Sequence, residues 1–445
     1  MLRTGEQERY ANYGTLECNI ASNRMPAHHV RTKCRLCSST DLLPVLSLTS
    51  TPPANAFVPP ELVKHTETAY PLTVSFCQSC THAQLVDVIC AEALFSHYVY
   101  VSGTSSVMVS HLREYAEEAL KYAEKVPSVR SCPLFVCEFG SNDGTLLKVF
   151  QEFGCNVLGV DPAQNLSQRA NEQGIPTWCG FFNSEMAERI KTEHGVADLI
   201  CANHVCAHID DFEEVLKGIK ILLSTTGIWI FEVGYLLDVY TKNLFDTIYH
   251  EHLDFHTVLP IRRILPEYGL RLYMARRVNI QGGALRCYVQ HDDSSPLPRE
   301  NLAQLAEMER LEAAAGLHNS ITFFQWEARI SQLGLELLSL LTGLQNAGKK
   351  IVGYGAPAKA TTLLYHFGIT EKILSFIVDD NPLKQGLYTP GLHIPVLPVE
   401  RIYDPNVAYV LILAWNFSDS ILSKHQRFTE AGGRFIVPLP NLKII

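Results

Sequence analysis

From about residue 134 onward, short apolar runs alternate with helical stretches, and this alternation constrains the possible folds most strongly. Four apolar runs occupy residues 134–138, 156–160, 198–202 and 228–232, and residues 211–223 form one of the helical stretches. Strands that are apolar throughout are buried on both faces, as in a parallel sheet whose strands are connected by helices. The pattern therefore predicts an α/β domain with a Rossmann-like sheet covered on both sides.

A second Rossmann-like α/β unit is expected after residue 349. Its apolar runs occupy residues 350–355, 373–378, 409–413 and 434–437. Between the two units, residues 300–347 are expected to form two helices that are broken near Gly316. The apolar stripe expected on these helices comprises Ile321, Phe324, Ile330, Leu337, Leu341 and Leu344.

Two Cys-x-x-Cys pairs lie ahead of these units, in a segment rich in Pro, Ser and Thr. They are Cys34 with Cys37 and Cys77 with Cys80. Two such turns can bring four thiolates onto one ion, which completes a closed, tetrahedral and therefore structural zinc site. The alternatives are two unrelated pairs of reduced thiols or a redox pair. A redox pair is disfavoured because neither pair begins a helix inside a βαβ unit.

The chain of 445 residues is too long for one compact domain. We expect an N-terminal extension (1–30), a zinc-binding module (31–95), a central α/β domain (96–292) and a C-terminal α/β domain with leading helices (293–445). A net charge of -9 and the lack of a basic run argue against a nucleic-acid-binding protein.

Features of the whole sequence favour a cytoplasmic enzyme. Its start has no apolar signal segment, and no apolar run approaches the roughly 18 residues of a membrane span. Thirteen cysteines in a chain of this length are not typical of a secreted disulfide framework. Several of them, such as Cys137, Cys201 and Cys206, lie in apolar segments where a reduced thiol acts as a small hydrophobe.

A glycine turn follows the first strand of the central domain and predicts a cofactor site. It lacks the third glycine of the dinucleotide fingerprint and the Gly-Lys-Ser/Thr of a phosphate loop. Asp161, at the end of the second strand, can accept hydrogen bonds from ribose hydroxyls. These features favour S-adenosylmethionine over NAD, and a plain strand–helix turn is the alternative. The expected cofactor contacts are Glu138, Gly140, Asn142, Asp143, Gly144, Asp161, Asn203 and His204.

The run Tyr249-His250-Glu251-His252 places a phenol, a carboxylate and two imidazoles in four consecutive residues. Imidazole titrates near neutral pH and a carboxylate can orient it, so the run is suited to proton transfer. A polar surface or a local hydrogen-bond network is the alternative. A metal site made by His250, His252 and His256 is a third reading, because alternate residues of a strand share a face.

The motifs and their order resemble those of the three-domain S-adenosylmethionine-dependent sugar C-methyltransferases. The resemblance covers roughly residues 32–443. It rests on the two cysteine pairs and on residues 138–147, 159–162, 245–252, 282–286, 353–359 and 414–416. It implies a zinc-binding module, a central S-adenosylmethionine-binding domain, and a C-terminal domain that helps to hold the nucleotide-linked sugar.

In that family the substrate is typically a dTDP-4-keto-6-deoxyhexose of an antibiotic pathway. The resemblance implies that Tyr249, Glu251 and His252 lie at the sugar, and that Tyr100 and His208 fall at further active-site positions. The chain departs from the family at Gln281, where a His is usual, and in its first thirty residues.

These observations lead to a mechanistic hypothesis. Removing a proton next to a ketone gives an enolate, which needs a base and hydrogen-bond donors for the oxygen. We expect His252 to be the base and Glu251 to orient or tune it, with Tyr249, Tyr100 or His208 as donors.

Three other functions are considered. An O- or N-methyltransferase of another small molecule would keep the cofactor but need no ketone. An NAD-dependent oxidoreductase would use Gly353-x-Gly355, although the third glycine is missing there. A non-catalytic, zinc-stapled binding protein would bind the cofactor without turnover. Lys359 is expected to be either a phosphate contact or an exposed lysine at a helix start.

Overall fold

The structure is a computed structural model. It describes residues 17–20, 23–26, 28–96, 98, 100–124, 133–293 and 296–445. Most of the extension expected at residues 1–30 lies outside these ranges. Its described strands are β1 (Glu17–Ile20) and β2 (Asn23–Pro26), which form a hairpin, and β3 (His28–Val30).

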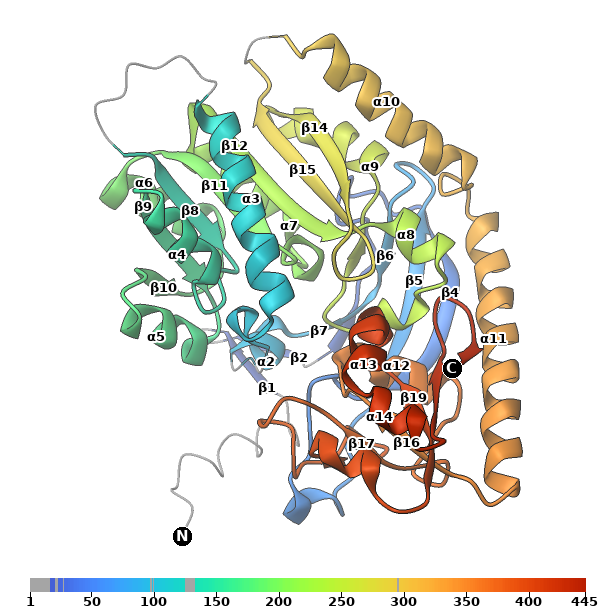
Figure 1. Cartoon of the computed structure of the whole chain (residues 1–445). Helices are drawn as coiled ribbons and strands as arrows, with labels where there is room; N and C mark the ends of the chain where they lie inside the picture. Colours follow the sequence, from blue (N-terminus) through green and yellow to red (C-terminus); the bar gives the residue numbers. More distant parts are fainter. Residues whose placement is uncertain are drawn as a thin grey trace.

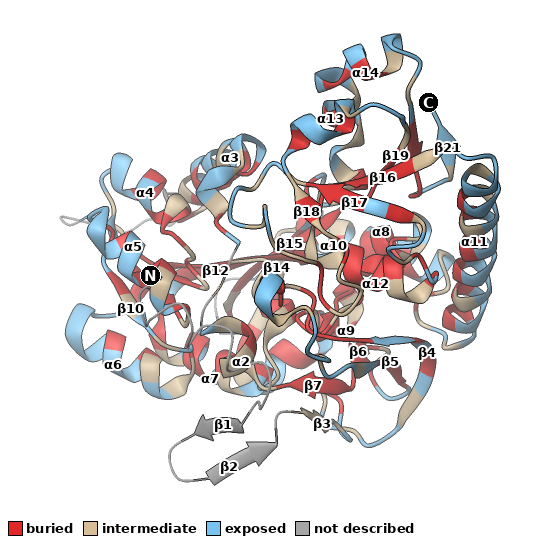
Figure 2. Cartoon of the chain, turned by 90° about the horizontal axis from the view of Figure 1, so that it is seen from below, coloured by how far each residue is buried: buried red, intermediate tan, exposed pale blue. Residues whose placement is uncertain are grey.

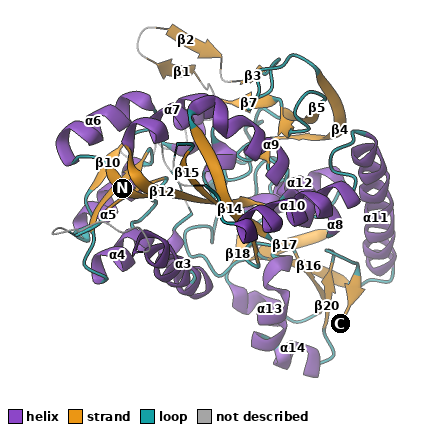
Figure 3. Cartoon of the chain, turned by 90° about the horizontal axis from the view of Figure 1, so that it is seen from above, coloured by secondary structure: helices purple, strands orange, loops and turns teal. Residues whose placement is uncertain are grey.

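The central domain contains a seven-stranded sheet in the order β10-β9-β8-β11-β12-β15-β14 (Figures 1 and 3). The first five strands are parallel, whereas β15 and β14 are antiparallel to their neighbours. The bounds are β8 (Phe135–Phe139), β9 (Asn156–Asp161), β10 (Thr177–Cys179), β11 (Ala197–Asn203), β12 (Leu223–Gly234), β14 (Leu270–Val278) and β15 (Ala284–His291). The four predicted strands of this region are confirmed as β8, β9, β11 and β12.

The chain order reverses between β8 and β11, which makes this point of the sheet a place for a ligand. β9 and β10 extend the sheet to one side of β8, and β11 and β12 extend it to the other. In open α/β sheets, ligands bind outside the carboxyl ends of the strands at such a switch point. The glycine turn that was predicted as a cofactor site follows β8 and therefore lies there.

Helices cover both faces of the parallel strands, as predicted. Phe135 and Cys137 of β8 pack with α6 and α7, while Val136, which points to the opposite face, packs with α3 and α4. The helices of this domain are α3 (Ser106–Glu124), α4 (Thr145–Glu152), α5 (Gln164–Glu172), α6 (Ser184–His194), α7 (Phe212–Leu222), α8 (Leu236–Thr241) and α9 (Val258–Ile264). Its 3-10 turns are η3 (Cys206–His208), η4 (Phe245–Thr247) and η5 (Leu265–Tyr268).

The N-terminal module is a small β-structure that includes one strand of the central domain. Its sheet has the order β13-β6-β5-β4, and β3 pairs separately with β7. The strand β13 begins two residues after His252 and pairs with β6, and the Leu85 amide donates to the Leu253 carbonyl at 2.8 Å. The elements are β4 (Leu42–Thr51), η1 (Pro60–Leu62), β5 (Tyr70–Cys77), β6 (Ala83–Leu85), β7 (Asp87–Ile89), α2 (Ala91–Phe95) and β13 (Asp254–Phe255). The turn η2 (Ser102–Thr104) follows α2 and contacts α3 of the central domain.

Two long helices, α10 (Arg299–Ala314) and α11 (Ile321–Asn346), run along one side of the molecule (Figure 1). The predicted break at Gly316 is confirmed; its φ of +79° is readily adopted by glycine. The predicted stripe is wrong at Ile321 and Phe324, which are 58% and 45% exposed. The side chain that turns inward is Phe323, because it packs on Phe76 of the N-terminal module, with ring centroids 5.6 Å apart. None of the helices in the described ranges combines the length and the apolar composition that a membrane crossing requires.

The C-terminal domain contains a second α/β sheet in the order β18-β17-β16-β19-β20-β21. The four predicted strands are confirmed as β16, β17, β19 and β20, and they are largely buried (Figure 2). The strands are β16 (Lys350–Tyr354), β17 (Leu374–Val378), β18 (Val396–Leu397), β19 (Val407–Ile412), β20 (Arg434–Val437) and β21 (Lys443–Ile444). The helices are α12 (Ala358–His366), η6 (Val399–Tyr403), η7 (Trp415–Phe417), α13 (Ser418–Lys424) and α14 (Gln426–Glu430).

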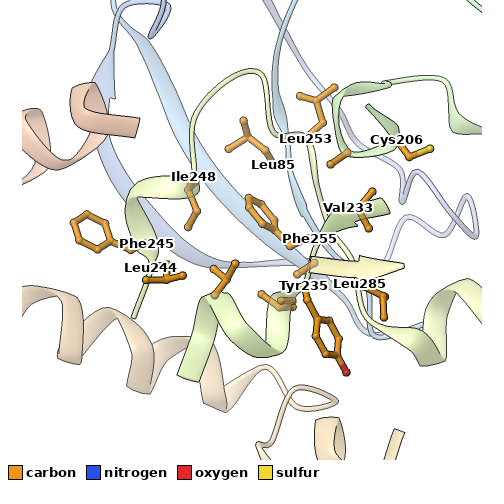
Figure 4. Close-up of a cluster of buried hydrophobic side chains, with 14 of the residues drawn as sticks. Leu85, Cys206, Val233, Tyr235, Leu244, Phe245, Ile248, Leu253, Phe255 and Leu285 are labelled. Atoms are coloured by element: carbon orange, nitrogen blue, oxygen red, sulfur yellow. The ribbon is translucent and has the colours of Figure 1, made fainter. Parts of the chain in front are cut away.

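A buried apolar cluster that includes side chains of residues 245–255 joins the central domain to the N-terminal module (Figure 4). It contains Leu85 from β6, Val233 from β12 and Phe245 from η4, together with Ile248 and Phe255. Burying each large apolar side chain contributes about 1.5–3 kcal/mol. The cluster therefore holds the segment with the Tyr-His-Glu-His run in one position relative to the central sheet.

Candidate active site

The four predicted zinc ligands come together. The Sγ atoms of Cys34 and Cys80 are 3.6 Å apart, as are those of Cys37 and Cys77, and all four lie within 4.8 Å of one another. Tetrahedral zinc with bonds of about 2.3 Å places sulfur atoms about 3.8 Å apart, so the cluster fits this ion. Four thiolates would occupy every position around it, which makes the zinc structural.

The three histidines that were considered as metal ligands do not converge. Among the described residues, the only group arranged for a metal ion is the cysteine cluster. His250 Nε2 lies 3.0 Å from the Pro71 carbonyl, and the buried His256 packs on His82 with ring centroids 5.5 Å apart. The metal reading of this segment is therefore wrong, because His250 lies in a turn and His256 lies beyond β13, and the two side chains contact different neighbours.

The glycine turn after β8 is held by hydrogen bonds to the second strand. Asp161 accepts from the Asn142 amide at 2.8 Å and from the Ala163 amide at 2.9 Å. Gly140 has a φ of +65°, and a Cβ added there would lie 2.5 Å from Val205 Cγ2. A glycine is needed at this position because of its backbone conformation and because Val205 lies against it.

Unpartnered polar atoms collect at this end of the sheet. Glu138 is 4% exposed, and its Oε2, like the Ser141 Oγ, has no hydrogen-bond partner within the described residues. Burial raises the pKa of Glu138 well above its usual range, and raises the pKa of Asp161 to about 6. Buried polar groups are normally paired, so these atoms fit a polar ligand such as a nucleoside. Glu138 and Asp161 are the residues that would hold S-adenosylmethionine.

Two of the expected cofactor contacts use their side chains to fasten residues 100–103 to the turn. Asn142 Oδ1 accepts from the Ser102 amide at 3.0 Å, and Asn142 Nδ2 donates to the Tyr100 carbonyl at 3.1 Å. Asp143 accepts from the Gly103 amide at 3.3 Å. Tyr100, which is 41% exposed, is thereby brought to the edge of the cofactor turn.

His204, after β11, is held by a buried carboxylate that was not predicted. Its φ is +54°, its amide donates to the Glu232 carbonyl at 2.7 Å, and its Nε2 lies 3.2 Å from Glu232 Oε1. Glu232 also contacts His111 at 2.7 Å and Arg286 at 2.9 Å. Burial opposes ionisation of Glu232, but the two histidines and Arg286 outweigh it and lower its pKa. The preceding residue, Asn203, lies beside Glu138.

The ring of His252 is oriented by the backbone. Its Nδ1 lies 2.7 Å from the Thr247 carbonyl, and its Nε2 lies 3.0 Å from the Tyr249 hydroxyl. A carbonyl only accepts, so Nδ1 carries the proton and Nε2 presents a lone pair, to which Tyr249 donates. Burial lowers the pKa of His252 to about 4, so the imidazole is neutral at physiological pH. His252 thus has the tautomer and charge of a general base.

Glu251 does not contact His252, so the expected carboxylate–imidazole pair is corrected. Its carboxylate accepts from Asn55 Nδ2 and from the Tyr98 hydroxyl, both at 2.7 Å. Glu251 lies in a turn that is closed by the His252 amide, which donates to the Tyr249 carbonyl at 2.8 Å, and its side chain contacts Asn55 and Tyr98 instead of His252. Burial raises the pKa of Glu251.

His208 lies next to His252, as the resemblance implied. The two ring centroids are 5.0 Å apart, and His208 stacks on Phe95 at 5.7 Å. Burial lowers the pKa of His208 well below its usual range, and the neighbouring His252 and His204 lower it further. The site therefore contains adjacent neutral imidazoles beside the cofactor turn.

The C-terminal domain contributes a lysine and an indole beside Asp246, which begins the segment that leads to His252. Trp415 Nε1 donates to Asp246 Oδ2 at 2.6 Å, and the Lys359 ammonium lies 3.4 Å from the centroid of the Trp415 ring. Lys359 Nζ also donates to Asn416 Oδ1 at 2.7 Å. Burial lowers the pKa of Lys359 to about 8, so the alternative of an exposed lysine is wrong.

Comparison with known proteins gives matches along the whole described architecture. Three family models match: a zinc binding domain (residues 34–95), a methyltransferase domain (108–274) and a C-methyltransferase C-terminal domain (279–440). The chain is 34% identical over 413 residues to the C-methyltransferase NovU of Streptomyces niveus, covering 93% of this chain and 96% of NovU.

Solved structures match about two fifths of the chain at low identity. A SAM-dependent methyltransferase from Anabaena variabilis is 17% identical and covers 40% of this chain and 84% of its own, with a TM-score of 0.33. The magnesium protoporphyrin IX methyltransferase of Synechocystis is 15% identical and covers 41% of this chain and 84% of its own, with a TM-score of 0.32. The family models and NovU show what the chain is: a SAM-dependent enzyme of the three-domain C-methyltransferase family, with a zinc-binding N-terminal module.

Proposed function

We propose that this enzyme methylates the carbon next to the ketone of a nucleotide-linked 4-keto-deoxysugar, with dTDP as the nucleotide, and that it acts through an enolate. The observation that carries the proposal is the state of His252. Its Nδ1 proton is held by the Thr247 carbonyl, and its Nε2 lone pair lies in a buried site beside the cofactor turn. A neutral imidazole of fixed tautomer is suited to removing a proton from carbon.

The other side chains of the site have separate roles in this proposal. When the sugar binds, Tyr249 releases His252 Nε2, and the Tyr249 hydroxyl and His208 then supply hydrogen bonds to the sugar and its developing oxyanion. Glu251 ties Asn55 of the N-terminal module and Tyr98 together and thereby shapes the sugar site. S-adenosylmethionine, when bound, supplies the methyl group, and its sulfur keeps the electrons of the bond that breaks.

The proposal extends to the cellular setting and to the domain limits. Synthesis of deoxysugars for antibiotics is proposed from the family resemblance. The core thiols of Cys137, Cys201 and Cys206 are free, which suits the reducing cytoplasm, whereas Cys90 is disulfide-bonded, which is rare there. A cytoplasmic location therefore stays a prediction. The limits 31–95, 96–292 and 293–445 are proposed for the domains, since they keep β14 and β15 with the central sheet.

The test is turnover with methyl-labelled S-adenosylmethionine and a panel of dTDP-4-keto-6-deoxysugars, followed by NMR. We expect the label on a carbon next to the ketone. Label on oxygen or nitrogen would reassign the enzyme as an O- or N-methyltransferase of another small molecule. A His252→Asn variant should bind the cofactor like the wild type but fail to exchange the substrate proton in D2O. Normal turnover of that variant would refute the assignment of the base.

A further inference from the structure

Lys359 lies in an environment that disfavours a cation. It occupies the first turn of α12, where the positive end of the helix dipole repels an ammonium group. Its Nζ donates one hydrogen bond, to Asn416, and one face of the ammonium is covered by the Trp415 ring. The carboxylate that acts on this ammonium group is Asp246; burial lowers the pKa of Lys359 to about 8, although the charge of Asp246 opposes this effect. Burial is therefore only partly compensated, and the ammonium group is suited to receive further negative charge from the substrate.

The position of Lys359 relative to His252 indicates which anion that is. His252 Nδ1 contacts the carbonyl of Thr247. The residue before Thr247 is Asp246, which accepts a hydrogen bond from Trp415 Nε1. The Lys359 ammonium group lies over the ring of this tryptophan. Burial is the main cause of the lowered pKa of His252, and the charges of His204 and Lys359 lower it further, so Lys359 belongs to the surroundings of the base.

Helix α12 is docked onto the segment that carries the base. Thr362 Oγ1 donates to the Ile248 carbonyl at 2.8 Å, and this carbonyl lies in the backbone between Thr247 and Tyr249. The position of Lys359 relative to His252 is therefore set by direct contacts between the C-terminal domain and residues 245–252.

We propose that Lys359 is a catalytic residue whose ammonium group donates a hydrogen bond to the ketone oxygen as it becomes an enolate oxygen. The inference rests on the proposed function, since it requires a ketone and a carbon acid. His252 Nε2 takes the proton from carbon, the electrons of that bond form the carbon–carbon double bond, and the carbonyl electrons move to oxygen. Lys359 stabilises the resulting negative charge in a site with little water. When carbon takes up the methyl group, the ketone is restored and His252 releases its proton to solvent.

The test separates an enolate contact from a phosphate contact. The exchange of substrate carbon-bound hydrogen in D2O is measured by NMR with S-adenosylhomocysteine present, which permits enolisation without methyl transfer. The probe is the dTDP-4-keto-6-deoxysugar that wild type exchanges fastest. We expect Lys359→Met to lower the exchange rate at saturating sugar by about 100-fold or more, because loss of one oxyanion donor has this effect elsewhere. Lys359→Gln is a second neutral variant should the first fail to fold.

The matched control is Lys372→Met, which removes an exposed lysine of the same domain and should exchange like the wild type. Lys359→Arg keeps the charge but has a planar shape, and should recover only part of the exchange rate. A Lys359→Met enzyme with normal exchange at saturation and only a raised KM would overturn the inference and make Lys359 a diphosphate contact. Wild-type enzyme that exchanges no sugar of the panel would instead overturn the proposed function, and the inference with it.

Discussion

Replacing Gly140 by alanine tests whether the cofactor turn is shaped by packing against Val205. Two costs add at this position. An L-residue in the left-handed region at φ +65° loses about 1–2 kcal/mol. The new Cβ would lie 2.5 Å from Val205 Cγ2 and 2.8 Å from Val205 Cβ, an overlap that must be relieved by movement and costs a further 1–3 kcal/mol or so. We therefore expect Gly140→Ala to destabilise the central domain by about 2–5 kcal/mol and to weaken cofactor binding.

A matched glycine separates the two costs. Gly154 has a φ of +81°, but a Cβ added there would meet nothing within 4 Å, so Gly154→Ala should cost only the conformational part. The second comparison is Gly140→Ala combined with Val205→Ala, which removes the 2.5 Å overlap with Cγ2 but leaves the Cβ of residue 205 at 2.8 Å, and should therefore recover part of the roughly 1–3 kcal/mol. The assays are urea unfolding of the full chain and calorimetric titration with S-adenosylmethionine. If Gly140→Ala costs no more than Gly154→Ala, or if Val205→Ala brings no recovery, the packing argument fails.

Three further predictions concern the base, the metal and a buried acid. His252→Gln should lower kcat by about 10²–10⁴-fold with little change in cofactor affinity, measured by steady-state kinetics and calorimetry. A variant with a raised KM but an unchanged kcat would contradict a role as base. Cys80→Ser should lower the zinc content and the melting temperature together, and full zinc occupancy in that variant would speak against four sulfur ligands. Glu312 is fully buried and accepts hydrogen bonds from the Tyr235 hydroxyl and the Val258 amide. Burial raises the pKa of Glu312 to about 7. The protonated side chain therefore contributes to stability below about pH 4.5, and this contribution is lost as the pH rises through about 7. The stability of wild type should accordingly fall relative to Glu312→Gln, by up to about 3 kcal/mol between pH 5 and pH 8, and parallel curves of melting temperature against pH would show that Glu312 does not titrate there.

Strands with a continuous apolar pattern could be predicted from the sequence, and strands interrupted by polar residues could not. The run 134–138 became β8, whose residues are buried on both faces. The antiparallel strands β14 and β15 were not predicted. In β14, Arg271 is only partly buried and Arg276 is exposed; β15 is largely buried, but Arg286 and Gln290 interrupt its apolar run. Burial on both faces makes a strand visible in composition, whereas a strand at the edge of a sheet depends on its neighbours.

The candidate site was predictable where side chains of one motif act together, and not where the partner is distant or is backbone. The motif pointed to His252 and Tyr249, which contact each other across three residues. The group that orients His252 is the carbonyl of Thr247, and a carbonyl has no sequence signal. Asn55 lies 196 residues from Glu251 in the chain, so only the fold brings them together.

The shared sheet of the N-terminal module limits how this enzyme can be recombined with its relatives. Strand β13 begins two residues after His252 and completes the sheet formed by β4, β5 and β6. A chimaera that exchanges residues 31–95 alone would place a foreign β6 against the native β13, and would disturb the register of the segment that carries the base. An exchange of acceptor specificity between relatives should therefore transfer residues 245–256 together with the metal-binding module. These two segments form one structural unit, although they are far apart in the sequence.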